Sequence, residues 1–297
     1  MIIKAQSKIA ILTSTYERPD LVLRCLRSAI NQNYENWELY LINDGSEKDY
    51  SEVEKLIAEN PRIKYYKFDY NKGLNAARNF GLERILDSDC DYFIVVDDDD
   101  LLSENALLLM NETVESYPGD RWLMFNVENI TKDYPYHQKP FEKVERVKYP
   151  EEFRQKFTGD RAHLFKVDCI KENKCIRFIT RIKNGSEITF FYKLSRYTQP
   201  LLINKIVKAI EYQPDGLSDT GRREFNYFRH AKVAVLHILE VPDSYYFYLE
   251  FIKHIINIKP IIRPLKPPYG KRIRSFLKKI LGDKYYQIKA LFKKENK

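Results

Sequence analysis

The sequence contains few of the residues that define several specialised protein classes. Among its 297 residues are 10 Gly, 13 Pro and 4 Cys, so fibrous, collagen-like and wholly disordered proteins are excluded. The four cysteines show no Cys-x-x-Cys spacing, which favours reduced thiols in a cytosolic protein. The five histidines have no spacing that is typical of metal ligands.

Long apolar segments are also absent. No apolar run approaches the ~18 residues of a membrane-spanning helix. Residues 1–19 lack a long apolar core and a small-residue cleavage site, so we expect no signal peptide. The content of 44% hydrophobic and 14% aromatic residues is ordinary for a globular protein that can bury a sizeable core. We expect one domain with an extension, or two small domains.

The net charge of +8 is unevenly distributed. Residues 253–297 carry 14 Lys and Arg against 2 Asp and Glu, a net charge of +12. The preceding residues carry 36 basic and 40 acidic side chains, a net charge of −4. A protein that binds nucleic acid over its body is not expected to have this distribution, so we predict no nucleic-acid partner. A basic tail on an acidic body favours tethering instead.

Short apolar runs alternate with helical patterns over the first hundred residues. This alternation predicts an α/β fold with a mostly parallel sheet covered by helices on both faces. Ligands of such sheets bind beyond the carboxyl ends of the strands. The expected strands are 8–13, 37–42, 63–68 and 92–96, and the expected helices begin near residues 18, 53 and 73.

The pattern is less regular after residue 101. We divide the chain into a first domain, 1–222, with halves 1–102 and 103–222, and a helical basic extension, 223–297. The expected later elements are helices at 107–117, 190–202 and 225–251, a strand at 122–127, and a stretch of undecided type at 201–210.

Four consecutive aspartates, Asp97 to Asp100, follow the strand at 92–96. Neighbouring carboxylates repel and raise one another's pKa, and a divalent cation removes that penalty. Mg²⁺ typically uses one or two carboxylates and completes its shell with phosphate oxygens. The alternative is a solvated acidic loop or a helix N-terminus. Because the cluster ends a buried strand, we predict a cation site for a diphosphate.

Three other side chains are candidates for the same crevice. Asp44 lies in a turn after the second strand, where it can accept from a base N–H; alternatively it caps a helix. Tyr16 offers a flat face beyond the first strand, or packs as an ordinary aromatic. Arg78 can pair with phosphate or carboxylate, or lie on a solvated helix face.

Five segments together resemble glycosyltransferase family 2, whose members are inverting enzymes with the GT-A fold. The resemblance is specific over residues 8–102, moderate to about residue 218, and absent beyond. It implies that Thr13, Tyr16, Asp44, Arg78, Asp97 and Asp98 bind the nucleotide. It also implies that Asp99, in the DxD position, binds Mg²⁺ or Mn²⁺. The segments are 10–19, 28–34, 41–46, 71–79 and 96–100.

The catalytic base departs from the family pattern. The family usually has Gly-Glu-Asp before a helix, whereas this chain has Gly185-Ser186-Glu187. The resemblance therefore implies that Glu187 is the base, although its extra methylene displaces the carboxylate by about 1 Å, and such a shift can cost ~10²-fold in rate. The alternative is a glutamate that complements the helix dipole. Gly216 and Ser218 resemble a loop that closes over the donor, or a plain turn.

The resemblance implies an inverting, metal-dependent glycosyltransferase that uses a nucleotide-sugar, with UDP favoured, and a saccharide or lipid-linked saccharide acceptor. Two alternatives are a catalytically weakened sugar-nucleotide-binding subunit and a sugar nucleotidyltransferase. The second usually has a glycine-rich phosphate loop, and residues 13–19 contain no glycine.

The tail has an apolar stripe, Ile273, Phe276, Leu277, Ile280 and Leu281, with basic residues on the other side. This pattern predicts peripheral binding to an anionic membrane surface on the cytoplasmic side, or packing on the body.

Overall fold

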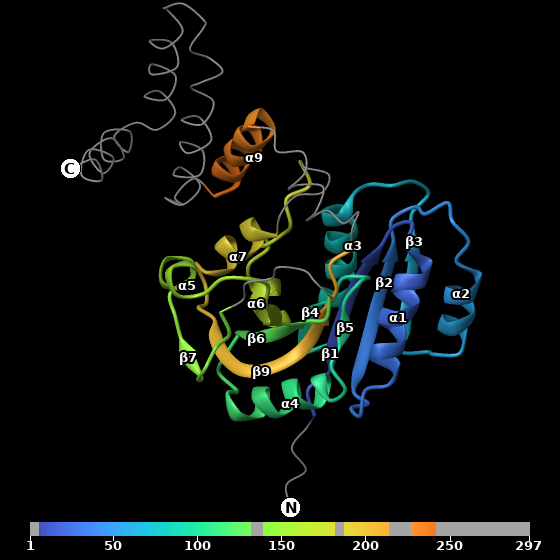
Figure 1. Cartoon of the computed structure of the whole chain (residues 1–297), viewed down its shortest axis with the longest axis horizontal. Helices are drawn as coiled ribbons and strands as arrows, with labels where there is room; N and C mark the ends of the chain where they lie inside the picture. The colour runs from blue at the N-terminus through green and yellow to red at the C-terminus, as the bar shows by residue number, and fades with distance from the viewer. Residues whose placement is uncertain (1–5, 132–138, 182–186, 214–226, 242–297) are drawn as a thin grey trace, which may run out of the picture. The chain divides into compact units, whose positions relative to one another are not determined.

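The computed structural model describes residues 6–131, 139–181, 187–213 and 227–241 (Figure 1). The chain divides into two compact units, residues 1–223 and 224–297. The second unit contains helix α9 (Tyr227–Glu240), within the helix predicted at 225–251. The basic amphipathic segment predicted for the tail lies outside the described residues. None of the helices in the described ranges is long and apolar enough to cross a membrane.

The first half of the sheet is parallel, as predicted. Strand β1 pairs with β2 on one side and with β4 on the other, and β2 pairs with β3. Each crossover contains a helix, which a parallel connection requires. The elements are β1 (Ile9–Thr15), α1 (Pro19–Ile30), β2 (Trp37–Asn43), α2 (Ser51–Ala58), β3 (Ile63–Lys67), α3 (Leu74–Leu86) and β4 (Tyr92–Val95).

The second half makes the sheet mixed. Strand β8 is antiparallel to both β4 and β6, whereas β9 is parallel to β6 and antiparallel to β5 and β7. The strand order is β3-β2-β1-β4-β8-β6-β9-β5, with β7 paired to β9. The elements are β5 (Leu101–Leu102), α4 (Ala106–Ser116), β6 (Trp122–Asn129), β7 (Glu145–Arg146), α5 (Glu151–Lys156), β8 (Ala162–Lys166), α6 (Val167–Glu172), α7 (Ile188–Leu194) and β9 (Leu201–Ile210).

The prediction of a helix at 190–202 is wrong at its C-terminal end. Helix α7 ends at Leu194, and residues 201–202 already belong to β9. Pro200 cannot continue a helix, and the β-branched residues that follow it favour a strand. The undecided stretch at 201–210 is therefore the strand β9, which pairs with β5, β6 and β7.

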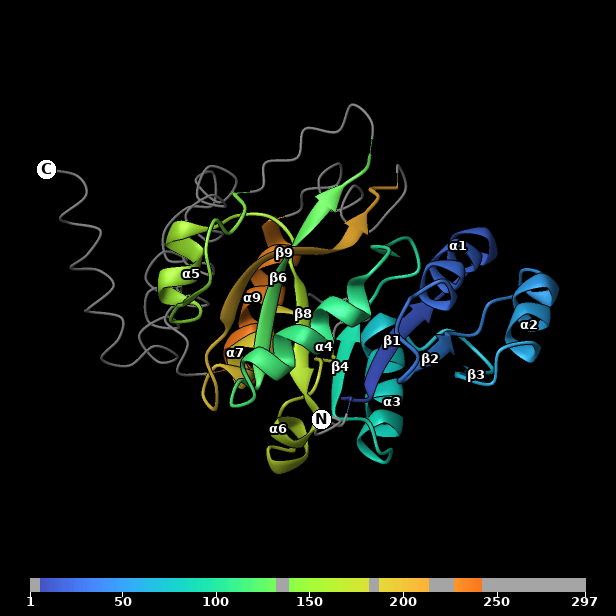
Figure 2. The same cartoon turned by 90° about the horizontal axis from the view of Figure 1, so that it is seen from below.

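Helices cover both faces of the sheet. The face with Ile11 and Leu41 packs with α1, α2 and α4 into one apolar core. Helix α3 lies on the opposite face, where Gly81 lets it approach: a Cβ there would lie 2.2 Å from Leu12 Cδ1. Figure 1 shows α6 and α7 on the side of β6 away from α4, and Figure 2 shows α1 and α4 on the near side. The carboxyl ends of β1, β2 and β4 are left accessible at one edge.

Candidate active site at the carboxyl ends of the strands

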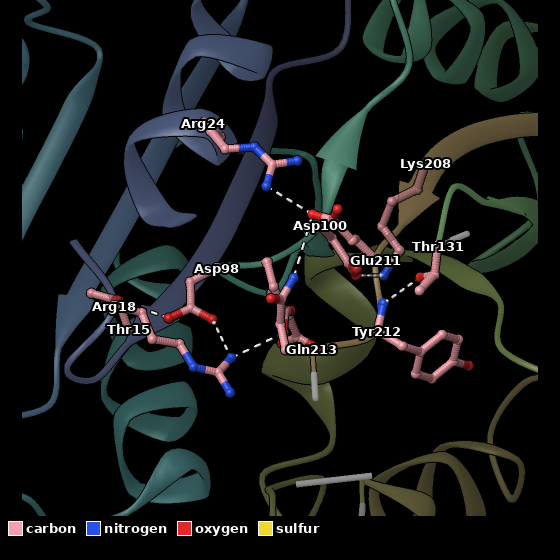
Figure 3. Close-up of polar contacts among 12 residues, drawn as sticks. Thr15, Arg18, Arg24, Asp98, Asp100, Thr131, Lys208, Glu211, Tyr212 and Gln213 are labelled. Carbon is pink, nitrogen blue, oxygen red and sulfur yellow. Dashed lines mark hydrogen bonds and ion pairs between the residues drawn. The ribbon is translucent and has the colours of Figure 1, made fainter. Parts of the chain in front are cut away.

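The loops that follow β1, β2 and β4 meet at this edge. The Asp44 N–H donates to the Thr15 carbonyl at 2.9 Å, which joins the first two loops. The Thr15 hydroxyl donates to Asp98 Oδ2 at 2.9 Å, which joins the first loop to the aspartate cluster (Figure 3). Parallel strands with aligned register bring their carboxyl ends together, so residues more than 80 positions apart become neighbours.

Asp97 and Glu187, the predicted base, both pair with the Arg78 guanidinium. Arg78 on α3 donates from Nη2 to Asp97 Oδ1 at 2.6 Å and from Nη1 to Glu187 Oε2 at 3.3 Å. The Arg78 side chain is only 5% exposed, whereas those of Asp97 and Glu187 are 43% and 39% exposed. The structure thus places Arg78 as a carboxylate partner, one of the roles predicted for it. It brings Glu187 to the aspartate cluster.

Asp98 and Asp99 both pair with the Arg18 guanidinium. Arg18 Nη1 lies 3.2 Å from Asp98 Oδ1 and 2.9 Å from Asp99 Oδ2. Asp98 also accepts the hydroxyl hydrogen bond of Thr15, which fixes its second oxygen. Thr15 in turn contacts the Tyr50 hydroxyl at 3.0 Å. Asp98 is therefore held on both oxygens, whereas Asp99, 20% exposed, is the more open of the two.

Asp100 points away to a buried lysine. Lys208 Nζ on β9 donates to Asp100 Oδ2 at 2.5 Å, and both side chains are less than one tenth exposed (Figure 3). Burial alone would lower the pKa of Lys208, but Asp100, Asp97 and Glu187 raise it overall, so this ammonium stays charged. It adds a fixed positive charge behind the cluster.

The residues present fit a divalent cation. Burial raises the pKa of Asp98 to about 6, a rise that Arg18 opposes. Burial, with the charges of Asp97 and Asp98, raises the pKa of Asp99 to about 6. These are carboxylates whose negative charge is under-compensated, and their oxygens are the donors that Mg²⁺ and Mn²⁺ prefer.

Burial also raises the pKa of Glu187, although Arg78 opposes the rise. A raised pKa is what a general base near neutral pH requires, because such a group accepts a proton more readily. For Asp97, burial would raise the pKa, but Arg78 and Lys208 together lower it. Asp97 therefore stays ionised beside Glu187.

Asp44 is engaged in holding a loop. Its carboxylate accepts from Asn71 Nδ2 at 3.0 Å, from the Lys72 N–H at 2.7 Å and from the Gly73 N–H at 2.8 Å. Gly73 is the residue before α3, so Asp44 braces the start of that helix. Asp44 is 3% exposed, so these three hydrogen bonds replace the water that its carboxylate has lost. The alternative that Asp44 caps the next helix is wrong, because neither α2 nor α3 has a side-chain cap hydrogen bond.

Tyr16 lines an open pocket beside Asp44. Its side chain is 45% exposed, as a stacking platform must be. The pocket has a volume of about 550 Å³ and is lined by Tyr16, Gly45, Ser46, Glu47 and residues 67–71.

The structure does not bring the Thr13 side chain into the site. Thr13 is 0% exposed, because it is on the face of β1 that packs against helices. The nucleotide-binding role of Thr13 therefore stays a prediction. Gly216 and Ser218, predicted as a donor loop, lie outside the described residues.

Arg18, Tyr50 and Lys208 were not predicted as site residues. Arg18 looked like the start of a helix, and Lys208 lay in a stretch of undecided type. Tyr50 follows a polar turn, and its hydroxyl links the Arg18 N–H at 3.1 Å to the Thr15 hydroxyl. Only the position of Arg18 two residues after Tyr16 could have pointed to the site.

A different acidic group lies at the opposite edge of the sheet. Ligand atoms of Glu38, Asp89 and Cys90 are within 4.8 Å of one another. The Lys8 ammonium already lies 3.1 Å from Glu38 and 2.6 Å from Asp89, so it neutralises this group. We do not assign a metal to it.

A solved structure has a similar fold. An S. aureus TarS 1–349 structure in complex with UDP-GlcNAc superposes with a TM-score of 0.68 at 15% identity, covering 89% of this chain and 77% of that one. This likeness confirms the predicted GT-A type of fold.

Two curated relatives match by sequence. A Rickettsia bellii protein named "Uncharacterized glycosyltransferase" is 34% identical over 109 residues, which are 37% of this chain and 15% of that protein. The Campylobacter jejuni "GalNAc(5)-diNAcBac-PP-undecaprenol beta-1,3-glucosyltransferase" is 29% identical over 192 residues, 63% of this chain and 59% of that one. The chain thus spans less than two thirds of the length of either relative.

The family model described as "Glycosyl transferase family 2" matches residues 10–184. These residues include all of β1 except Ile9, the strands β2 to β4, Arg18, Arg78 and the whole aspartate cluster. The chain therefore belongs to glycosyl transferase family 2, a family of glycosyltransferases, as the sequence motifs predicted.

Proposed function

We propose that this protein is an inverting, divalent-cation-dependent glycosyltransferase that moves a sugar from a UDP-sugar to a hydroxyl of a saccharide acceptor. The observation that carries the proposal is the link Asp97–Arg78–Glu187, which holds a half-exposed carboxylate of raised pKa beside the aspartate cluster. A base and a diphosphate-binding cluster at one edge are the two parts that a single displacement needs.

In this proposal, Tyr16 stacks on the base from the wall of the pocket. Asp44, which directly precedes the pocket residue Gly45, accepts the N–H of the base. Asp98 binds near the ribose. Asp99 is the principal ligand of Mg²⁺ or Mn²⁺, and Asp97 keeps Arg78 in place. A bound cation would supply charge neutralisation for the departing diphosphate.

Glu187 removes the proton of the acceptor hydroxyl as that oxygen attacks the anomeric carbon. The nucleoside diphosphate leaves from the opposite side, so the anomeric configuration inverts and no covalent carboxylate intermediate forms. Arg78 keeps the Glu187 carboxylate directed at the site when no acceptor is present.

The acceptor in this proposal is a lipid-linked saccharide. The support is the printed name of the Campylobacter relative, which identifies an undecaprenol-linked acceptor for that protein. The basic amphipathic tail would bring the protein to an anionic membrane where such acceptors lie. Liposome flotation with and without residues 269–297 tests the tail, and equal binding of both forms would reject it.

The test of the chemistry uses UDP release from a panel of UDP-sugars with Mn²⁺ and saccharide acceptors. We expect E187Q to bind UDP normally and to turn over ~10²–10⁴-fold more slowly, the usual contribution of general base catalysis. We expect D99N to lose the response to Mn²⁺. The matched control is E83Q. Glu83 is not a member of the proposed site, and its carboxylate pairs with Arg177 at a distance of 2.7 Å.

The product anomer, identified by NMR, tests inversion. Full activity of E187Q would remove the base assignment. UDP binding without turnover on any donor would favour the alternative of a sugar-nucleotide-binding subunit.

A further inference from the structure

Arg18 contacts both Asp98 and Asp99, and Asp99 is the proposed cation ligand. A single nitrogen, Nη1, lies 3.2 Å from Asp98 Oδ1 (Figure 3). The same nitrogen lies 2.9 Å from Asp99 Oδ2. The Arg18 side chain is 29% exposed, so it can leave this position without opening the core. The Arg18 guanidinium therefore neutralises part of the negative charge of Asp98 and Asp99, as a bound divalent cation would.

The backbone before Arg18 is held so that this contact forms. Glu17 has φ of 59°, in the left-handed region that residues other than glycine rarely adopt. Its N–H donates to Ser46 Oγ at 3.0 Å, and its carboxylate accepts from the Glu47 N–H at 2.6 Å. The Arg18 N–H then donates to the Tyr50 hydroxyl at 3.1 Å. These bonds leave Tyr16 facing the pocket while Arg18 turns back onto the carboxylates.

Both oxygens of Asp98 already accept a hydrogen bond from the protein. Its Oδ2 already accepts from the Thr15 hydroxyl at 2.9 Å, and its Oδ1 accepts from Arg18. Because Arg18 Nη1 lies 2.9 Å from Asp99 Oδ2, binding of a cation at Asp99 has to displace the guanidinium or compete with its charge. Once displaced, a guanidinium is best satisfied by an anion of matching geometry, and the oxygens of a diphosphate provide one.

We propose that Arg18 is a resident counter-ion for Asp98 and Asp99, which the divalent cation displaces, so that the cation binds tightly only together with the nucleoside diphosphate. This inference rests on the proposed function, because it assumes the cation site at Asp99. It predicts coupled binding, in which UDP strengthens Mn²⁺ binding and Mn²⁺ strengthens UDP binding by the same factor.

The experiment is a Mn²⁺ titration of the full chain, followed by the EPR signal of free Mn²⁺, with and without UDP. We expect R18Q to bind Mn²⁺ about tenfold more tightly than the wild type when UDP is absent, since it removes charge-assisted hydrogen bonds that compete with the cation. The factor by which UDP strengthens Mn²⁺ binding should shrink correspondingly.

The matched control is R24Q. Arg24 lies on α1 and pairs with Glu211 at 2.7 Å, so this variant makes the same change of net charge without touching the carboxylates. It should bind Mn²⁺ like the wild type. R18K keeps a positive charge but not the fork of donors, so its Mn²⁺ affinity should lie between those of R18Q and the wild type. Thermal melting curves verify that each variant is folded.

The inference is overturned if R18Q binds Mn²⁺ no more tightly than the wild type while D99N abolishes binding. That result would leave the cation site of the proposed function intact. If D99N binds Mn²⁺ as the wild type does, the cation site itself is misplaced and both proposals fail. If R18Q and R24Q tighten binding equally, the effect is one of net charge, and the specific role of Arg18 is rejected.

Discussion

Replacing Arg78 with methionine, which has a similar length, removes the cation between Asp97 and Glu187. Breaking a fully buried ion pair costs about 3–5 kcal/mol, whereas an exposed pair contributes about 0–1 kcal/mol. Arg78 itself is buried, but its partners are 43% and 39% exposed and can be hydrated after the change. We therefore expect R78M to lower the free energy of unfolding by about 2 kcal/mol, between those limits.

Urea unfolding followed by tryptophan fluorescence measures this change. Both tryptophans, Trp37 and Trp122, are buried in the first unit, so the signal reports on the unit that contains Arg78. With a typical slope of 1–3 kcal/mol per molar urea, the unfolding midpoint should fall by about 1 M. The loss should be smallest at acid pH, where the carboxyl groups are protonated, and should grow as pH rises through the raised pKa of Glu187.

A double-mutant cycle with E187Q separates the ion pair from packing. E187Q should stabilise R78M more than the wild type. In R78M it removes a carboxylate that has no cation and repels Asp97, whereas in the wild type it also breaks the pair with Arg78. The coupling should reach about 1 kcal/mol. In the active enzyme, R78M should also move the acid limb of the rate profile to higher pH, because Arg78 opposes the rise in the pKa of Glu187. Equal effects of E187Q in both backgrounds, with no change in midpoint, would refute the reasoning.

Three further predictions concern other parts of the first unit. K208M should lower the free energy of unfolding by about 3–5 kcal/mol because it leaves Asp100 buried without its partner, and D100N should recover most of the loss; urea midpoints measure both. G45A should distort the pocket and weaken UDP binding measured by calorimetry, because its Cβ would lie 2.3 Å from the Tyr70 carbonyl carbon at φ of 73°, and normal affinity would contradict this. Burial lowers the pKa of His163 to about 3, so the stability it contributes is complete above pH ~6.5 and is lost as pH falls towards 3. In H163Q, urea midpoints should depend less on pH over that range.

Much of the fold could be predicted from the sequence because its signals are local. The strands β1 to β4 are short apolar runs, and the helices between them show their own periodicity, so residues 8–96 specify their elements without reference to the rest of the chain. Beyond residue 101 this failed in part, since a two-residue strand such as β5 and a strand such as β9, whose type depends on its partners, carry weak local signals.

The candidate site was predicted by residue type but not by contact. Asp97 to Asp99, Tyr16 and Glu187 were found because motifs mark them. Arg78 was also predicted, but its pairing with Glu187 and the partner Arg18 were not, because a salt bridge between residues 80 to 109 positions apart has no sequence signature.

The sequence by itself determined the alternation of strands and helices, the acidic cluster after β4 and, through its motifs, the family. The tertiary structure alone decided how charge is balanced at the site. Strand order sets Lys208 of β9 behind Asp100, and a left-handed residue turns Arg18 onto Asp98 and Asp99. Hydrophobic periodicity depends on neighbours in the chain, whereas burial and ion pairing depend on neighbours in space, and only the folded sheet brings these charges together.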